Sequence, residues 1–256
     1  MGQKLLAGNW KMNLTLPQAE ALTSEIVQIL KTEVLSNVPM VLCPPALYLT
    51  RVQHLIKDSA NVFLGAQNVF YEPSGAFTGE ISAPMLKSVG CTYAIVGHSE
   101  RRSYFGETNE KVLQKVQALI QADIRPILCI GEVQWQRESG ITLQIIEEQL
   151  RDSLFAVSET NVAKVIIAYE PVWAIGTGLT ATPEQAQEVH AFIREQLTKQ
   201  YGATIASEMT ILYGGSVKAN NAKGLFSQPD VDGALVGGAS LNSREFVGVY
   251  QALGSV

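Results

Sequence analysis

The chain has 256 residues, of which 46% are hydrophobic and 17% are charged, and its formal net charge at pH 7 is −5. This composition is typical of a soluble globular protein of one or two domains. The mild acidity and the lack of a basic run argue against a nucleic-acid partner. No apolar stretch is long enough to cross a membrane, and residues 1–10 lack the apolar length of a signal peptide.

Three cysteines, Cys43, Cys91 and Cys129, form no closely spaced pair and lie in or beside apolar runs. This pattern predicts small core residues in a reducing compartment, so we expect a cytoplasmic protein. Nothing in their spacing predicts a metal cluster.

Eight short apolar runs alternate with segments that carry hydrophobic residues at helical spacing. The predicted strands are 4–9, 39–43, 62–67, 93–97, 126–130, 165–169, 209–213 and 231–236. The helices predicted after them are 17–30, 49–56, 83–89, 109–121, 145–155, 183–200, 219–226 and 243–253. No linker interrupts the alternation, so we expect one domain over residues 1–256. Eight strand–helix units of this length favour a closed (β/α)8 TIM barrel over an open doubly wound sheet.

In such barrels the functional groups lie at the carboxyl ends of the strands. Polar residues and glycines concentrate at these ends, which read Asn9 and Lys11, Gln67 and Asn68, His98, Glu132, Glu170, Gly214–Gly215–Ser216 and Gly237–Gly238. The strand starts carry few polar residues. We therefore expect these residues to converge on one mouth of the barrel.

The end of the sixth strand is the most informative segment. The apolar run stops at Glu170, and the proline after it keeps Glu170 extended, so this residue is predicted to end the strand. The apolar loop that follows, 172–178, ends in two glycines, a composition that suits a lid with a hydrophobic underside. The alternative is a plain surface loop with Glu170 as a helix cap. It is the weaker one, because Thr182 with the next proline already supplies a helix start.

Together these segments resemble the triosephosphate isomerase family. The matching motifs, in chain order, are 9–11 (Asn-Trp-Lys), 65–68 (Gly-Ala-Gln-Asn), 96–102 (Val-Gly-His-Ser-Glu-Arg-Arg), 168–178 (Ala-Tyr-Glu-Pro-Val-Trp-Ala-Ile-Gly-Thr-Gly), 213–217 (Tyr-Gly-Gly-Ser-Val) and 235–239 (Leu-Val-Gly-Gly-Ala). A lone Gly-Gly-Ser is weak evidence, whereas all of these in order, each at a strand end, are very specific. The resemblance implies interconversion of D-glyceraldehyde 3-phosphate and dihydroxyacetone phosphate through an enediol(ate), without a cofactor.

The resemblance also implies the catalytic roles. Glu170 is the expected base, and exclusion of water should raise its pKa and its reactivity toward a carbon acid. His98 is the expected electrophile, kept neutral by backbone N–H groups at the following helix start. Lys11 should supply positive charge to the enediolate, with Asn9 as a neutral hydrogen-bonding group. A structural histidine and a solvated surface lysine are the plain alternatives.

The expected phosphate site contains no arginine. Because the net charge is negative, local groups have to hold an anion. The Gly214–Gly215–Ser216 turn and the Gly237–Gly238 pair bring bare backbone N–H groups close together after two adjacent strands, and Gly176 should add a lid N–H on closure. Tight-turn geometry is the alternative for each glycine pair.

Further residues are expected to support the site. The resemblance makes Glu100 the ion-pair partner of Lys11, and it makes Ile175 and Leu235 an apolar pair that crowds the base when the lid shuts. Leu235 can equally be barrel core. Cys129 belongs to the same supporting group.

The lid has its own supporting residues. The resemblance assigns Tyr213 and Ser216 to the closed lid and Glu132 to the open one. Leu179 stands where the family often has lysine, which affects the expected rate of lid opening.

The segment 70–80 is too apolar for a free loop of its length. It resembles the family's interlocking dimer loop, with Thr78 reaching toward the partner's Asn9 and the partner's His98. We therefore expect a homodimer; an exposed, flexible loop tip is the alternative.

Two rival functions are less consistent with the sequence. A Schiff-base aldolase needs a desolvated lysine near a strand's carboxyl end, yet the sixth strand has Lys164 at its start and Glu170 at its end. A non-catalytic barrel that binds a phosphorylated ligand would retain the glycine pairs, but it has no need for Glu170, His98 and Lys11 together.

Overall fold

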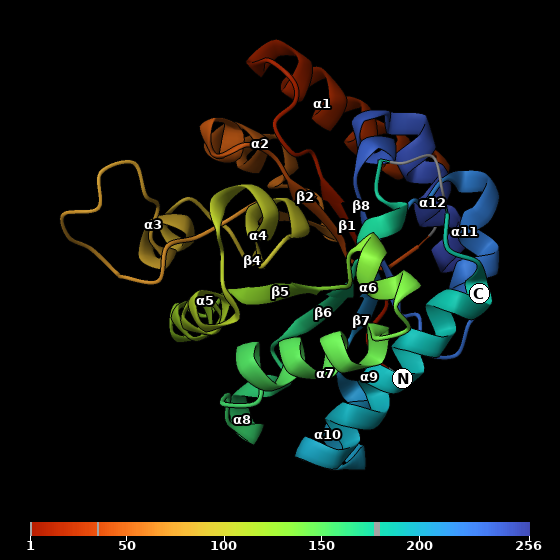
Figure 1. The fold of residues 1–256 in the computed structure, drawn as a ribbon. Helices are drawn as coiled ribbons and strands as arrows, with labels where there is room; N and C mark the ends of the chain where they lie inside the picture. Colours follow the sequence, from red (N-terminus) through yellow and green to blue (C-terminus); the bar gives the residue numbers. More distant parts are fainter. Residues whose placement is uncertain (1, 35, 177–179) are drawn as a thin grey trace.

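The computed structural model describes residues 2–34, 36–176 and 180–256. Its eight strands are β1 (Leu5–Asn9), β2 (Met40–Cys43), β3 (Val62–Ala66), β4 (Tyr93–Val96), β5 (Arg125–Ile130), β6 (Ile166–Tyr169), β7 (Ile211–Tyr213) and β8 (Gly233–Val236). They pair in parallel in chain order and close into a barrel, with helices around the outside (Figure 1). The predicted (β/α)8 barrel is confirmed.

Helices separate the strands. They are α1 (Leu16–Glu33), α2 (Leu49–Ile56), α3 (Ala83–Ser88), α4 (Ser99–Phe105), α5 (Asn109–Gln121), α6 (Gln134–Glu138), α7 (Thr142–Ser153), α8 (Glu159–Val162), α9 (Pro183–Tyr201), α10 (Ala203–Glu208), α11 (Ala219–Phe226) and α12 (Ser243–Gly254), with 3-10 turns η1 (Ala46–Tyr48), η2 (Val172–Ala174) and η3 (Gly238–Leu241). The described helices include none that is both long and apolar enough to span a membrane.

The sequence predicted a helix start after His98 but not the extent of α4, and it did not predict α6, α8 and α10. Each has between four and seven residues, which is too short for a helical hydrophobic period to be recognised. The predicted start of α9 is confirmed: the Thr182 side chain accepts a hydrogen bond from the Gln185 amide, and Pro183 is the first helical residue.

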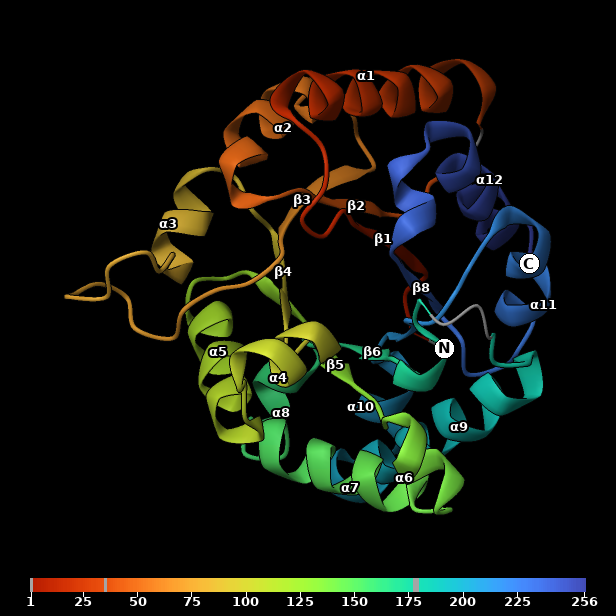
Figure 2. The same ribbon diagram turned by 45° about the horizontal axis from the view of Figure 1, so that its top comes forward.

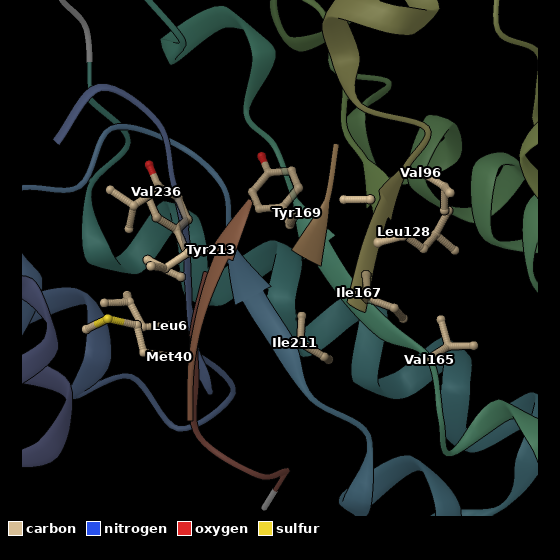
Figure 3. Close-up of a cluster of buried hydrophobic side chains, with 14 of the residues drawn as sticks. Leu6, Met40, Val96, Leu128, Val165, Ile167, Tyr169, Ile211, Tyr213 and Val236 are labelled. Carbon is tan, nitrogen blue, oxygen red and sulfur yellow. The ribbon is translucent and has the colours of Figure 1, made fainter. Parts of the chain in front are cut away.

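The alternation of side chains along each strand separates two cores. The interior of the barrel holds Leu5, Ala7, Val41, Cys43, Tyr93, Ile95, Ile127, Cys129, Ile166, Ala168, Leu212 and Leu235. The residues between them point outward and pack against the helices, among them Leu6, Met40, Leu128, Ile167, Tyr169 and Tyr213 (Figure 3). Because successive strand residues face opposite sides, the position after Tyr169 faces inward.

That position is Glu170, and its place differs slightly from the prediction. β6 ends at Tyr169, and Glu170 is the next residue. The Glu170 amide still donates to the Ile130 carbonyl at 2.7 Å, so the chain stays in register with β5 for one more residue. The proline that follows cannot continue the ladder.

At the amino ends of the last two strands, Arg194 of α9 joins several chain segments. Its guanidinium donates to the Ala206 and Met209 carbonyls and pairs with Asp232 at 2.8 Å. Asp232, which is 4% exposed, also accepts from the Ile211 amide at 2.9 Å. Burial raises the pKa of Asp232, and the Ile211 amide and Arg194 oppose this effect. The arginine therefore holds α10, β7 and β8 together around a buried charge.

We predict that Arg194→Met lowers the free energy of unfolding by about 3–5 kcal/mol, because it leaves Asp232 buried without its partner. The matched control is Lys199→Met on the same helix, where the ammonium lies 2.7 Å from Glu195 in an exposed pair; it should cost no more than about 0.5 kcal/mol. Urea unfolding at fixed protein concentration measures both. Equal losses for the two variants would contradict the prediction.

Candidate active site

A cavity of about 640 Å³ opens at the carboxyl ends of the strands. The expected site residues that line it are Asn9, Lys11, His98, Glu170, Ile175, Gly176, Gly215, Ser216, Leu235, Gly237 and Gly238. The others, Thr78, Glu100, Cys129, Glu132 and Tyr213, do not line it. Leu179 lies outside the described residues. Among those described, no group of three or more His, Cys, Asp or Glu side chains is arranged to bind a metal ion.

The Glu170 carboxylate is buried, with 2% exposure, and both of its oxygens have partners. Oε1 lies 3.0 Å from Nε2 of His98, and Oε2 accepts from the Ser99 amide at 2.9 Å. The Ser99 amide belongs to the first turn of α4, whose positive end faces the carboxylate. In this arrangement Glu170 is excluded from water without being left unpaired.

These partners set the direction of the Glu170 pKa. Burial raises it, but His98, the Ser99 amide and Lys11 together outweigh burial, and the net pKa is lowered. The expectation of a raised pKa is therefore wrong for this arrangement. Loss of water alone would raise this pKa, but two hydrogen-bond donors, the His98 ring and the Ser99 amide, replace the water and lower it. Only movement away from His98 and Ser99 can leave burial as the dominant effect.

His98 is held in one tautomer. Its Nδ1 accepts from the Glu100 amide at 3.2 Å, so the ring proton lies on Nε2, which faces Glu170. Burial lowers the pKa of His98, whereas the Glu170 and Glu100 carboxylates raise it, and the net direction is upward. The upward contribution comes mainly from Glu170. The ring thus presents an N–H to the cavity, and its basicity depends on where Glu170 lies.

Lys11 has an unusual backbone conformation, with φ of 52°. Two side chains hold it there: Asn9 Oδ1 accepts from the Lys11 amide at 3.0 Å, and Gln67 Nε2 donates to the Lys11 carbonyl at 2.8 Å. The Lys11 ammonium lies 2.6 Å from Oε1 of Glu100. A left-handed lysine is strained, and here the strain keeps the ammonium at the cavity. From the sequence, Gln67 was predicted to lie at a strand end, but no role was predicted for it.

The two glycine segments differ in what they require. A Cβ at Gly215 would meet the Tyr213 hydroxyl at 2.3 Å, so close packing explains this glycine. A Cβ at Gly238 would meet nothing within 4 Å, and neither Gly237 nor Gly238 has a positive φ. Gly237 has φ −87° and ψ −110°, outside the regions that other residues favour, so backbone geometry accounts for this glycine, whereas neither packing nor a positive φ accounts for Gly238. Its bare backbone, at the start of η3, is open to a ligand in the cavity.

The described part of the lid, residues 172–176, rests on Glu132. Oε1 of this carboxylate accepts from the Trp173 indole at 2.8 Å and from the Tyr169 hydroxyl at 3.1 Å. Burial raises the pKa of Glu132, and these two donors oppose it. The Arg137 guanidinium lies 5.6 Å from the Trp173 ring centre. The predicted lid is thus attached to Glu132, two residues after β5, and to α6, while Ile175 and Gly176 line the cavity.

Tyr213 lies under the cavity. Its hydroxyl is buried and makes no hydrogen bond in the described part of the chain. Burial raises its pKa to about 12, an effect partly offset by the Ala181 backbone. Cys129 is also buried, and burial with the nearby Glu170 charge raises the pKa of its thiol.

Sequence reasoning missed several residues. Lys218, Asn242 and Glu245 also line the cavity, next to the glycine segments. Asn242 caps α12 by accepting from the Glu245 amide, a local pattern that the sequence could have revealed. Gln149 binds the chain beside Glu170 and gives no sequence signal, because it lies in the middle of α7.

We predict that Glu170→Gln lowers the pKa of His98, because it removes the main negative charge that stabilises the imidazolium. Histidine ring signals followed by NMR over a pH series measure this value. Glu208→Gln, at an exposed position of α10, is the control and should leave it unchanged. An unchanged His98 pKa in Glu170→Gln would show that the two side chains are not coupled.

The sequence was compared with known protein families and proteins. The family model described as triosephosphate isomerase matches residues 4–253. Among the similar proteins, the triosephosphate isomerase of Cytophaga hutchinsonii is 54% identical over 98% of this chain and 100% of its own length. That of Chloroherpeton thalassium is 50% identical over 98% of this chain and 99% of its own length. That of Endomicrobium trichonymphae is also 50% identical, over 96% and 97% respectively.

These matches cover nearly the whole chain at about half identity, and residues from five of the six sequence motifs line one cavity at the carboxyl ends of the barrel strands. The chain therefore belongs to the triosephosphate isomerase family, and it is an isomerase.

Proposed function

We propose that this isomerase interconverts D-glyceraldehyde 3-phosphate and dihydroxyacetone phosphate, with Glu170 as the base and an enediol(ate) as the intermediate. One observation carries the proposal: Glu170, His98 and Lys11 line the same cavity as the two glycine segments. A binding protein needs only the glycines. The aldolase alternative lacks support, because Lys164 lies at the opposite end of β6 and its ammonium is 3.7 Å from Asp123 in an exposed pair.

Binding begins at the phosphate. The backbone N–H groups of Gly215, Ser216, Gly237 and Gly238 bind its oxygens, and Lys11 attracts the dianion into the cavity. The carbonyl and hydroxyl oxygens of the substrate then lie near Nε2 of His98. They take over the N–H that Glu170 accepts in the free protein, and this exchange releases the base.

Proton transfer follows. Closure of the lid brings Ile175 toward Leu235 and excludes water, and Gly176 adds an N–H to the phosphate. Once the substrate has taken the His98 N–H, the effect of burial on the Glu170 carboxylate is less opposed, so its pKa rises and it removes a proton from the carbon next to the carbonyl. The electron pair moves to the carbonyl oxygen, and Lys11 and the His98 N–H stabilise the resulting negative charge. The hydroxyl proton of the substrate passes to the former carbonyl oxygen by way of His98, which donates its Nε2–H to one oxygen and takes a proton from the other. Glu170 then returns its proton to the neighbouring carbon, and the former hydroxyl oxygen becomes the carbonyl oxygen.

Closure also protects the intermediate. An enediolate beside a phosphate can eliminate it, so water and conformational freedom have to be kept out. Tyr213 and Ser216 hold the closed lid in this proposal, whereas Glu132 holds the open one through Trp173. The buried Tyr213 hydroxyl supports this assignment, because its O–H donates to no acceptor among the described residues.

We predict that Glu170→Gln lowers kcat by about 10³-fold or more, because the amide cannot accept the substrate proton. A coupled assay of glyceraldehyde 3-phosphate isomerisation measures the rate. Glu147→Gln, at an exposed position of α7, is the matched control and should retain wild-type turnover. An inactive wild-type protein would refute the function, whereas a fully active Glu170→Gln variant would refute only the base.

We also propose that the chain forms a homodimer in the cytoplasm. The segment 70–80 projects from the barrel beside α3, as Figure 2 shows. A second cavity, of about 330 Å³, is lined by Lys11, Met12, His98 and Phe105, and it is rimmed by apolar side chains that include Met12 at 96% exposure. This cavity is where Thr78 of a second copy is proposed to insert. The buried free thiols support a reducing compartment.

We predict that wild-type protein sediments as a dimer at micromolar concentration and that Met12→Glu shifts it toward monomer. The new carboxylate would be buried without a partner in the interface. Trp135→Glu is the control, since Trp135 is 60% exposed but does not line this cavity. Analytical ultracentrifugation distinguishes the species; a monomeric wild-type protein would contradict the homodimer.

A further inference from the structure

Gln149 of α7 binds one residue of the chain twice. Its Oε1 accepts from the Gly131 amide at 2.7 Å, and its Nε2 donates to the Gly131 carbonyl at 3.0 Å. The amide side chain therefore satisfies both backbone groups of a single residue, in the way a neighbouring strand would. Gly131 is the first residue after β5. Gln149 therefore replaces the strand-to-strand hydrogen bonds that hold the residues before Gly131.

The residues before and after Gly131 each accept a backbone hydrogen bond from the segment that begins at Glu170. The Ile130 carbonyl accepts from the Glu170 amide at 2.7 Å, and the Glu132 carbonyl accepts from the Val172 amide at 3.1 Å. The residue that Gln149 binds is thus the centre of the segment that positions the proposed base and the first residue of the lid.

Direct packing adds a second link. A Cβ on Gly131 would lie 1.8 Å from the Glu170 carbonyl oxygen, so the two backbones are in close contact. A cavity of about 210 Å³ adjoins the segment, with Gly131, Gln149, Glu170 and Val172 among its lining residues. The segment has space to move into, and the two hydrogen bonds of Gln149 oppose that movement.

We propose that Gln149 is a positioning residue for catalysis, which acts through Gly131 to hold the Glu170 backbone and the start of the lid in register. The inference rests on the proposed function, because it takes Glu170 as the base. Gln149 does not touch the substrate cavity. Its contribution is the placement of the carboxylate relative to His98 and Ser99, and such placement matters steeply, since a displacement of about 1 Å can cost 100-fold in rate.

The test uses Gln149→Met, which keeps the length of the side chain and removes both hydrogen bonds. We expect kcat to fall by about 10-fold to 100-fold with KM unchanged, since the phosphate loops are untouched. The acidic limb of the kcat/KM profile should move to higher pH. Weaker contacts of Glu170 with His98 and Ser99 leave burial, which raises its pKa, less opposed.

Gln144→Met, at an exposed position of the same helix, is the control and should leave kcat and the pH profile unchanged. Hydrogen exchange supplies a readout that is independent of activity. In Gln149→Met the amides of Gly131, Glu170 and Val172 should exchange faster, whereas that of Ile167, bound to the Thr210 carbonyl, should not. If Gln149→Met does not fold, Gln149→Glu, which keeps an acceptor and loses the donor at neutral pH, replaces it, with the same changes expected.

The outcomes separate the two proposals. An inactive wild-type protein refutes the isomerase reaction, and the exchange measurement still reports on the link from Gln149 to Glu170. An active wild-type protein with unchanged kcat and pH profile in Gln149→Met refutes the positioning role. A lower melting temperature with wild-type turnover has the same meaning, because it shows a contribution to stability alone.

Discussion

The site depends on the two hydrogen bonds that hold the Glu170 carboxylate in the absence of a ligand. A buried carboxylate without partners is costly, and this one is stabilised by the His98 ring and the Ser99 amide. The same contacts orient the imidazole and keep its N–H toward the cavity. They also lower the pKa of Glu170, and in the proposed mechanism the carboxylate stays a weak base until the substrate takes the His98 N–H. The interaction that orders the free site is thus the same one that, in the proposed mechanism, has to break when His98 turns to the substrate and Glu170 becomes the base.

Much of the fold could be predicted from the sequence because its signals are local. Apolar runs identify the strands, and the barrel rule places Asn9, His98 and Glu170 at one mouth. The alternation of side chains explains why Glu170 points into the cavity, while Tyr169 points outward to Glu132. Sequence motifs were sufficient for these residues because strand geometry, rather than loop detail, sets their positions.

The remaining features arise from contacts between distant parts of the chain. Gln149 stands 18 residues from the glycine that it binds, and nothing in its helix distinguishes it from Gln144. The left-handed Lys11 depends on a bond from Gln67, 56 residues away. The direction in which the Glu170 pKa is shifted could not be predicted without knowing its hydrogen-bond donors, because burial raises this pKa and the donors lower it. Short helices such as α4 have too few residues for a helical hydrophobic period to be recognised. The Ser99 amide of α4 nevertheless binds the Glu170 carboxylate.

The closure of β8 against β1 has a consequence for the order in which the molecule is built. Lys11 comes from the first strand, whereas Gly237 and Gly238 come from the last, and all three line one cavity. During synthesis Lys11 emerges more than 200 residues before Gly237, which lies beside its side chain in the folded protein. A nascent chain can form early strand–helix units, but no partial product encloses the cavity. The complete cavity therefore exists only in a chain whose eighth strand has paired with the first.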